Sequence, residues 1–163
     1  MKKIINLKQA INLSKKLKAE NKTLVVTGGC FDILHIGHIK FLEKAKEQGD
    51  FLFILLESDE NVRKLKGNNR PINSQKERAQ ILAALSCVDF VVLLNKMKKN
   101  DDYDNLIYKI NPNIIVTTKD DPQGIHNERQ AKKIKAKVSY VIDRIENKST
   151  SKLAKIISKN FDR

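Results

Sequence analysis

The chain has 163 residues and a formal net charge of +13, from 32 Lys and Arg against 19 Asp and Glu. This length fits one domain with small extensions. A chain of this size can bury a sheet beneath its covering helices without disulfide bonds or structural metals. The charge excludes an acidic disordered tail and favours anionic partners, without choosing among nucleic acid, lipid headgroups and small phosphorylated molecules.

Two kinds of apolar pattern alternate along the chain. Short apolar or β-branched runs predict buried strands, at residues 23–27, 51–56, 88–94, 114–117 and 138–142. Apolar residues three and four positions apart predict helices, at residues 7–20, 36–48, from Ser74 onward, 101–110, 126–135 and from Ser149 onward. Ser74 and Glu77 match a capping box at the start of one helix.

Strands that alternate with helices predict an α/β fold. We expect a single-domain, doubly wound, Rossmann-like sheet of five parallel strands with helices on both faces. Residues 1–22 are expected to form an N-terminal helical extension, and residues 23–163 the main domain. In such sheets a ligand binds beyond the carboxyl ends of the strands, near the point where the strand order reverses.

Cysteine use and the absence of a long apolar run predict a cytoplasmic protein. Cys30 and Cys87 do not make a disulfide framework, and no apolar run reaches the ~18 residues of a membrane helix. Met1 to Ala19 lacks the features of a signal peptide. The 26 Lys, 6 Arg and 6% aromatic residues argue against nucleic acid, which proteins read mainly with Arg and stacking rings.

Residues 28–38 form the loop that is expected to carry the chemistry. His35 and His38 stand three positions apart at the expected start of a helix, which places both imidazoles on one face. The unpaired amides and the dipole of a helix N-terminus favour an anion there, and Gly37 leaves room for its approach. The loop is neither a GxGxxG fingerprint nor a Walker A loop. The pattern therefore predicts a phosphate cradle with two imidazole donors.

Three other interpretations of the loop remain open at this point. Cys30, His35 and His38 have residue types that bind zinc. The two histidines are also suited to capping the helix, and the loop is suited to binding a nucleotide without catalysis. On its charge alone, the chain also fits a basic nucleic-acid-binding module.

The sequence GCFDILHIGH at residues 29–38 resembles the HxGH signature of the cytidylyltransferase-like nucleotidyltransferases. The resemblance runs from about residue 24 to residue 157. Its further segments are Ser58-Asp59, residues 63–67, residues 70–73, Arg78, residues 83–89 and residues 144–151. It implies the transfer of a nucleoside monophosphate from a nucleoside triphosphate, with Mg²⁺, to a phosphorylated acceptor, with release of pyrophosphate.

Within the family the resemblance points first to the adenylyltransferase domain that makes ADP-heptose from heptose 1-phosphate. Glycerol-3-phosphate cytidylyltransferase, which uses CTP, is the alternative, and its loop usually has Thr where Cys30 stands. After the fourth expected strand the family usually has Gly-Gly-Asp or Gly-Asp-Asp, whereas this chain has Thr117-Thr118-Lys119-Asp120-Asp121. The larger side chains would crowd a backbone approach to the base, which leaves ATP and CTP open.

The resemblance also implies roles for particular residues. The expected catalytic residues are His35, His38 and Lys64. The expected nucleotide-binding residues are Gly29, Cys30, Phe31, Gly37, Lys66, Arg144, Ser149 and Thr150. Asp32, Asp59 and Arg78 are expected to orient the loop or to contact substrate. A solvated helix end is the alternative for the two lysines, and a plain helix cap for Ser149 and Thr150.

No protein ligand for a metal is identified, so Mg²⁺ is expected to arrive with the nucleotide. The resemblance implies a homodimer, because family members of this kind are often homodimers. It also implies a separate sugar kinase that supplies the phosphorylated acceptor.

Overall fold

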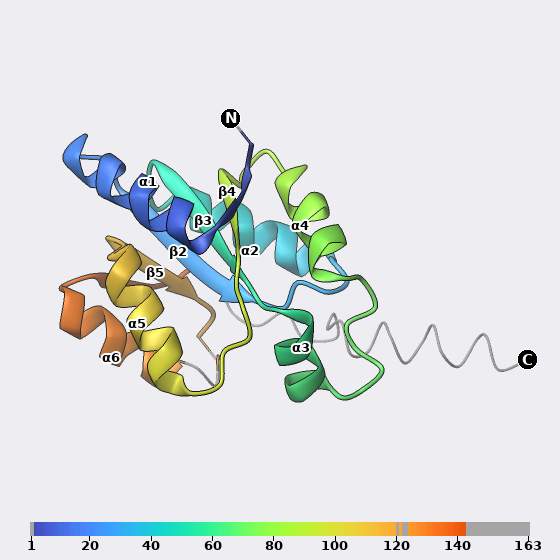
Figure 1. The fold of residues 1–163 in the computed structure, drawn as a ribbon. Coiled ribbons are helices and arrows are strands. Elements are labelled where there is room, and N and C mark those ends of the chain that lie inside the picture. Colours follow the sequence, from blue (N-terminus) through green and yellow to red (C-terminus); the bar gives the residue numbers. More distant parts are fainter. Residues whose placement is uncertain (1, 120, 122–123, 143–163) are drawn as a thin grey trace, which may run out of the picture.

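The computed structural model describes residues 2–119, 121 and 124–142 as one layered α/β unit (Figure 1). Strands and helices alternate along the chain. In order they are β1 (Ile4–Asn6), α1 (Leu7–Ala19), β2 (Leu24–Gly29), α2 (Ile36–Lys46), β3 (Phe51–Leu56), α3 (Asp59–Lys66), α4 (Gln75–Ala83), β4 (Phe90–Leu93), α5 (Asn100–Ile110), β5 (Ile114–Thr117), α6 (Gly124–Ile134) and β6 (Lys137–Tyr140).

All described strands are parallel, in the spatial order β1-β4-β3-β2-β5-β6. The chain passes from β2 to β3 and β4 on one side, then returns to β5 and β6 on the other side of β2. The strand order therefore reverses between β2 and β5. This arrangement confirms the predicted parallel fold, and in such folds ligands bind at the carboxyl ends of the strands where the order reverses.

The central strands are buried on both faces, as their continuous apolar sequences predict. Phe53 and Leu55 of β3 pack with α1, α5 and α6, whereas Leu52, Ile54 and Leu56 pack with α2 and α4. Because side chains of a strand alternate between faces, a fully apolar run such as Phe51–Leu56 needs helices on both sides. The prediction of two helical layers is confirmed.

The predicted number of strands is wrong, because the described residues already form a sheet of six strands rather than five. Ile4–Asn6 pairs in parallel with β4, in register from Ile4–Val91 to Asn6–Leu93. These residues were expected within an N-terminal helical extension, and only Leu7–Ala19 is helical there. Three residues are too short to show a two-residue period in the sequence, so the strand is specified by its partner β4.

Local capping agrees with the sequence at α4. The Ser74 hydroxyl accepts from the Glu77 amide at 3.4 Å, and the Glu77 carboxylate accepts from the Ser74 amide at 2.8 Å. This is the predicted capping box. The side chain of Gln75 then donates to the carbonyls of Leu56 and Leu94, which joins the start of α4 to the carboxyl ends of β3 and β4.

Candidate active site

The loop between β2 and α2 lies at the reversal of strand order. β2 ends at Gly29 and α2 begins at Ile36, so the loop starts at the carboxyl end of the strand that adjoins β5. The amides of Cys30 and Phe31 donate no hydrogen bond to another described residue. Two N–H groups are therefore available to a ligand at this end of the sheet.

The two histidines form the N-terminal cap of α2 with one nitrogen each. The Gly37 amide donates to Nδ1 of His35 at 3.1 Å, and the His35 amide donates to Nδ1 of His38 at 3.3 Å. The two rings lie against each other, tilted by 33°, with their centroids 3.9 Å apart. A neutral imidazole that accepts at Nδ1 carries its proton on Nε2. Capping therefore orients both rings and fixes the tautomer that donates through Nε2. The helix-capping role and the expected role as phosphate donors are thus compatible.

His38 is held in its neutral form. Burial lowers the pKa of His38 from 6.5 to about 4, and the neighbouring His35 adds to this effect. Protonation would also place a hydrogen on the Nδ1 that accepts the His35 amide. At neutral pH His38 is therefore an uncharged donor, suited to a phosphate oxygen on which charge develops.

Phe31 and Gly29 shape the wall of the loop next to His38. The Phe31 ring is 7% exposed and lies 5.5 Å from the His38 ring, centroid to centroid. Phe31 has φ +44°, in the left-handed region that residues with a side chain rarely adopt. A Cβ at Gly29 would lie 2.8 Å from Cε2 of this ring. Gly29 is thus required for the packing of Phe31, which in turn supports His38.

Asp32 is a structural anchor of the loop. Its carboxylate is buried, pairs with Arg70, and accepts from the amides of Ile72 and Asn73 at 2.9 to 3.0 Å. Burial raises the pKa of Asp32, but the two amides and the Arg70 guanidinium outweigh it and hold the pKa below its ordinary value. Asn73 also donates to the Asp32 carbonyl at 2.9 Å. These bonds tie the loop to residues 70–73.

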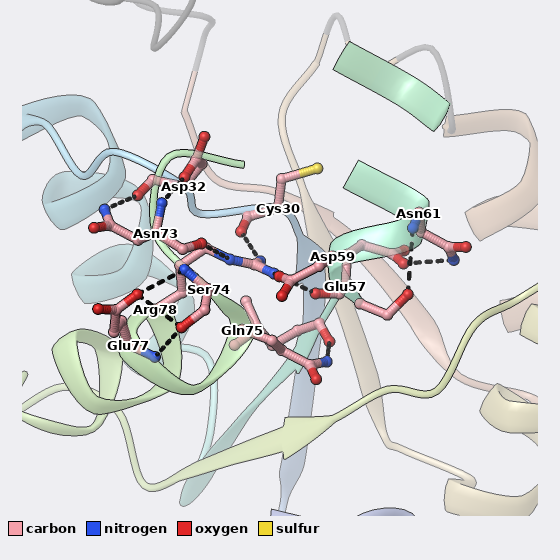
Figure 2. A network of polar contacts seen from close by, with 12 residues as sticks. Cys30, Asp32, Glu57, Asp59, Asn61, Asn73, Ser74, Gln75, Glu77 and Arg78 are labelled. Atoms are coloured by element: carbon pink, nitrogen blue, oxygen red, sulfur yellow. Dashed lines mark hydrogen bonds and ion pairs between the residues drawn. The ribbon is translucent and has the colours of Figure 1, made fainter. Parts of the chain in front are cut away.

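Arg78 is the second anchor, and none of its side chain is exposed. Figure 2 shows the Arg78 guanidinium between segments that are distant in the sequence. The guanidinium donates to four acceptors, which are the carbonyls of Cys30, Glu57 and Asn73 and the carboxylate of Asp59. All three of its nitrogens are used in this way. Arg78 and Asp59 therefore orient the loop and the end of β3. The sequence could not separate this role from phosphate binding, because the acceptors meet only in the folded chain.

Lys66 is the last residue of α3, a helix that the sequence pattern did not predict, and its side chain is exposed. Burial raises the pKa of the Cys30 thiol, while nearby Lys66 exerts the largest opposing influence. Lys64 is exposed on the same helix and has no contact with the loop among the described residues. Lys66 thus acts electrostatically on Cys30, and a phosphate contact of either lysine stays a prediction.

The zinc interpretation finds no support. Cys30, His35 and His38 are all described, yet no group of three His, Cys, Asp or Glu side chains in the described chain is arranged to hold a metal ion. His126, on α6, has a buried Nδ1 without a hydrogen-bond partner and lies near Asp104. It contributes no ligand to the loop.

The departure from the family pattern lies directly at the reversal point. Thr118 is half-buried and Lys119 exposed at the carboxyl end of β5, and the Thr117 hydroxyl donates to Asp121. Asp120, Arg144, Ser149 and Thr150 lie outside the described residues, as does the expected closing helix. Within the described chain, no helix has the length and apolar character needed to cross a membrane.

The parallel sheet with its strand reversal, and the loop at that point, define a Rossmann-like protein of the α/β class. A model of the cytidylyltransferase-like family matches residues 26–160. The chain belongs to this family, which confirms the resemblance noted in the sequence.

Similar proteins support the same placement. The chain is 47% identical over 115 residues to Bifunctional protein HldE of Campylobacter fetus subsp. fetus, covering 71% of this chain and 23% of that protein. It is 40% identical over 158 residues to Bifunctional protein HldE of Helicobacter hepaticus, covering 97% of this chain and 31% of that protein. The chain therefore spans less than a third of either relative.

Two solved structures have the same fold. The crystal structure of the lipopolysaccharide core biosynthesis protein from Thermoplasma volcanium aligns with a TM-score of 0.62 and 26% identity, over 77% of this chain and 99% of that one. Pantoate-beta-alanine ligase from Francisella tularensis aligns with a TM-score of 0.64 and 18% identity, over 98% of this chain and 78% of that one. The second likeness concerns the fold alone.

Proposed function

We propose that the chain transfers a nucleoside monophosphate, with ATP as the favoured donor, to a phosphorylated sugar such as heptose 1-phosphate. An oxygen of the acceptor phosphate attacks the α-phosphorus, the bond from that phosphorus to the β-phosphate oxygen breaks, and pyrophosphate leaves. The observation that carries this proposal is the adjacent pair His35 and His38, whose capping bonds at Nδ1 orient their Nε2 donors at the N-terminus of α2. The HldE relatives support the choice of acceptor.

The chemistry requires mainly positioning and charge stabilisation, because the acceptor brings its own nucleophile. His35, His38 and the amides of Cys30 and Phe31 contact the phosphates, and Lys66 supplies a point charge suited to a phosphate oxygen. In this proposal Lys64, Arg144, Ser149 and Thr150 keep their expected phosphate-binding roles. Gly29 and Gly37 give the backbone room for the ligand.

Mg²⁺ is proposed to enter as part of the nucleotide substrate. Asp32 and Asp59, the carboxylates nearest the loop anchors, are already paired with Arg70 and Arg78. The described residues also contain no group of three His, Cys, Asp or Glu side chains that could hold a metal ion. The triphosphate oxygens would hold the ion, as is common for Mg²⁺. The ion neutralises charge on the leaving pyrophosphate.

CTP-dependent transfer to glycerol 3-phosphate or another polyol phosphate is the second candidate. Thr118 and Lys119, at the β5 end where the family usually has glycines, leave the choice between ATP and CTP open. A sugar kinase would supply the acceptor for the favoured reaction. A homodimer and a cytoplasmic location remain predictions, and nucleic-acid binding would rest on the net charge alone.

The test is a pyrophosphate-release screen of ATP and CTP, with Mg²⁺, against phosphorylated sugars and polyols. We expect one pair to turn over, and His35→Ala or His38→Ala to lower the rate by at least ~10²-fold, the scale of losing a transition-state donor. His126→Ala is the matched control, because His126 lies on α6 and makes no bond to the loop. Absence of release with every pair, or full rate in both loop variants, would refute the proposal.

A further inference from the structure

A pocket lies between α1 and α5, which pack against each other on one face of the sheet. Its volume is about 400 Å³, within the range of roughly 300–1,000 Å³ that is typical of sites for small organic ligands. Leu7 at the start of α1, Met97 in the loop after β4 and Leu106 on α5 form its apolar wall. Leu106 is buried, and Leu7 and Met97 pack against the core. We call this cavity the α1–α5 pocket.

The polar wall of the α1–α5 pocket is basic. Lys96 and Lys98 line it from the loop after β4, and Lys109 lines it from α5. All three lysines are exposed, and none forms an ion pair with a described residue. Asp102 also lines the pocket, but its carboxylate accepts from the amides of Lys98 and Lys99 at 2.7 and 3.1 Å. Three cations thus stand against one carboxylate that is engaged with the backbone, and a concave surface with an excess of one charge attracts the opposite ion.

The α1–α5 pocket is separate from the phosphate loop between β2 and α2. Its lining residues on α5 stand three, four and seven positions after Asp102 and therefore share one face of the helix. Tyr103 lies on another face, where its hydroxyl accepts from Asn61 of α3. In the sheet, β4 is two strands from β2 and β1 is three, which is roughly 10–15 Å at about 4.8 Å per strand. A ligand held by the three lysines would therefore not share the histidine pair.

We propose that the α1–α5 pocket binds a small phosphate ester, with the phosphate on the three lysines and the organic part against the apolar wall. Lys binds a phosphate oxygen as a point charge and does not require the paired geometry of Arg. The side chain of Asn105, in the same pocket, can donate to and accept from a hydroxyl group of the organic part. The site does not depend on the proposed function, because none of its residues belongs to the histidine loop.

The methionines of the chain provide a reporter inside the pocket. The sequence contains two, Met1 and Met97, so labelling with ¹³C-methyl methionine gives one signal from each, and Met97→Leu assigns the signal of the pocket. The full chain is titrated with glucose 1-phosphate, with inorganic phosphate and with uncharged glucose, and the Met97 signal is followed by nuclear magnetic resonance. Vesicles of phosphatidylglycerol, compared with vesicles of net-neutral phosphatidylcholine, test a lipid headgroup as the source of the phosphate.

Two triple variants that lose the same charge separate a site from general attraction to a basic protein. The pocket variant combines Lys96→Gln, Lys98→Gln and Lys109→Gln. The control variant combines Lys15→Gln, Lys18→Gln and Lys22→Gln, which are exposed and lie beyond the first two turns of α1. Lys109→Gln alone is measured in parallel and keeps the test valid if the pocket variant does not fold. His38→Ala tests whether the phosphate loop contributes to the response.

We expect glucose 1-phosphate to shift the Met97 signal in a saturable way, more tightly than inorganic phosphate, and glucose to have no effect. The pocket variant should bind at least about tenfold more weakly, the scale of losing three partly exposed charge contacts. The control variant and His38→Ala should remain within about twofold of the unaltered chain, as for distant sites. A response to phosphatidylglycerol vesicles alone that is lost in the pocket variant would support the site with a lipid headgroup as its ligand.

Four results would overturn the proposal. They are equal affinity in the two triple variants, loss of the response in His38→Ala, an equal response to glucose, and no saturable shift with any phosphate-bearing probe. Each leaves the proposed function standing, because that function is tested by pyrophosphate release and by the histidine variants.

Discussion

Acidification should destabilise this protein through His38 before its carboxylates titrate. The unfolded chain binds a proton at His38 with a pKa near 6.5, whereas in the folded chain the pKa lies at about 4. Between these values the unfolded state holds more protons, so the free energy of unfolding falls as the pH falls. The contribution is fully present above pH 6.5 and is lost by pH 4. The shift of about 2.5 units corresponds to about 3 kcal/mol in total.

The assay is urea unfolding at a series of pH values, followed by circular dichroism. Between pH 7 and pH 4.5 the unaltered chain should lose about 2–2.5 kcal/mol from this group. His38→Asn is the matched variant, because its side-chain oxygen can accept the His35 amide in place of Nδ1 and does not titrate. We expect the variant to lose much less stability over this range.

The pH range from 7 to 4.5 separates the titration of His38 from that of Asp32 and Asp104. Asp32 and Asp104 have pKa values below their ordinary value of 3.8, so their protonation destabilises the fold mainly below pH 4. Equal pH dependence in the unaltered chain and in His38→Asn would refute the claim that His38 is held neutral by burial. A stability that increases on acidification would refute it as well.

Three other substitutions probe the anchors of the loop. Arg78→Met should lower the free energy of unfolding by about 3–5 kcal/mol in urea titrations, because it removes a fully buried cation and leaves its acceptors unpaired. Gly29→Ala should lower nucleotide affinity about tenfold, because its Cβ would lie 2.8 Å from the Phe31 ring. Gly124→Ala is the control, because its Cβ meets nothing within 4 Å, and its affinity should be unchanged. Equal affinities of the two variants in calorimetry would contradict this prediction. Asp32→Asn should cost about 2–3 kcal/mol at pH 7. Because the pKa of Asp32 is lowered by folding, the difference from the unaltered chain should shrink as the pH falls below 3.8.

The sequence predicted the elements whose pattern is long or strongly apolar. The run Phe51–Leu56 can only be a strand buried on both faces, and the capping box at Ser74 locates the start of α4. The spacing of His35 and His38 placed them at a helix N-terminus, which the structure confirms. In each case the signal lies within a few neighbouring residues.

The missed elements lack such a local signal. β1 has three residues and is specified by its pairing with β4. Helix α3 shows no apolar stripe, because Val62 is its only buried apolar residue. Its other contacts are polar: Asn61 donates to Glu57 and Tyr103, and Asp59 pairs with Arg78. Its partners, Glu57 and Tyr103, are distant from one another in the sequence. A hydrophobic pattern cannot reveal a helix that is held by hydrogen bonds between distant segments.

The positive charge of the chain also has a more specific meaning in the fold. Both arginines beside the loop are paired with carboxylates, Arg70 with Asp32 and Arg78 with Asp59. An arginine retains its proton when it is buried, so such a pair can serve as permanent scaffold. At this loop a triphosphate would therefore meet His35, the neutral His38 and backbone amides rather than the guanidinium groups of Arg70 and Arg78. The selectivity of the site for phosphate then depends on how accurately these donors are held. Arg70 and Arg78 therefore matter to binding because they hold the loop, although they do not contact the ligand.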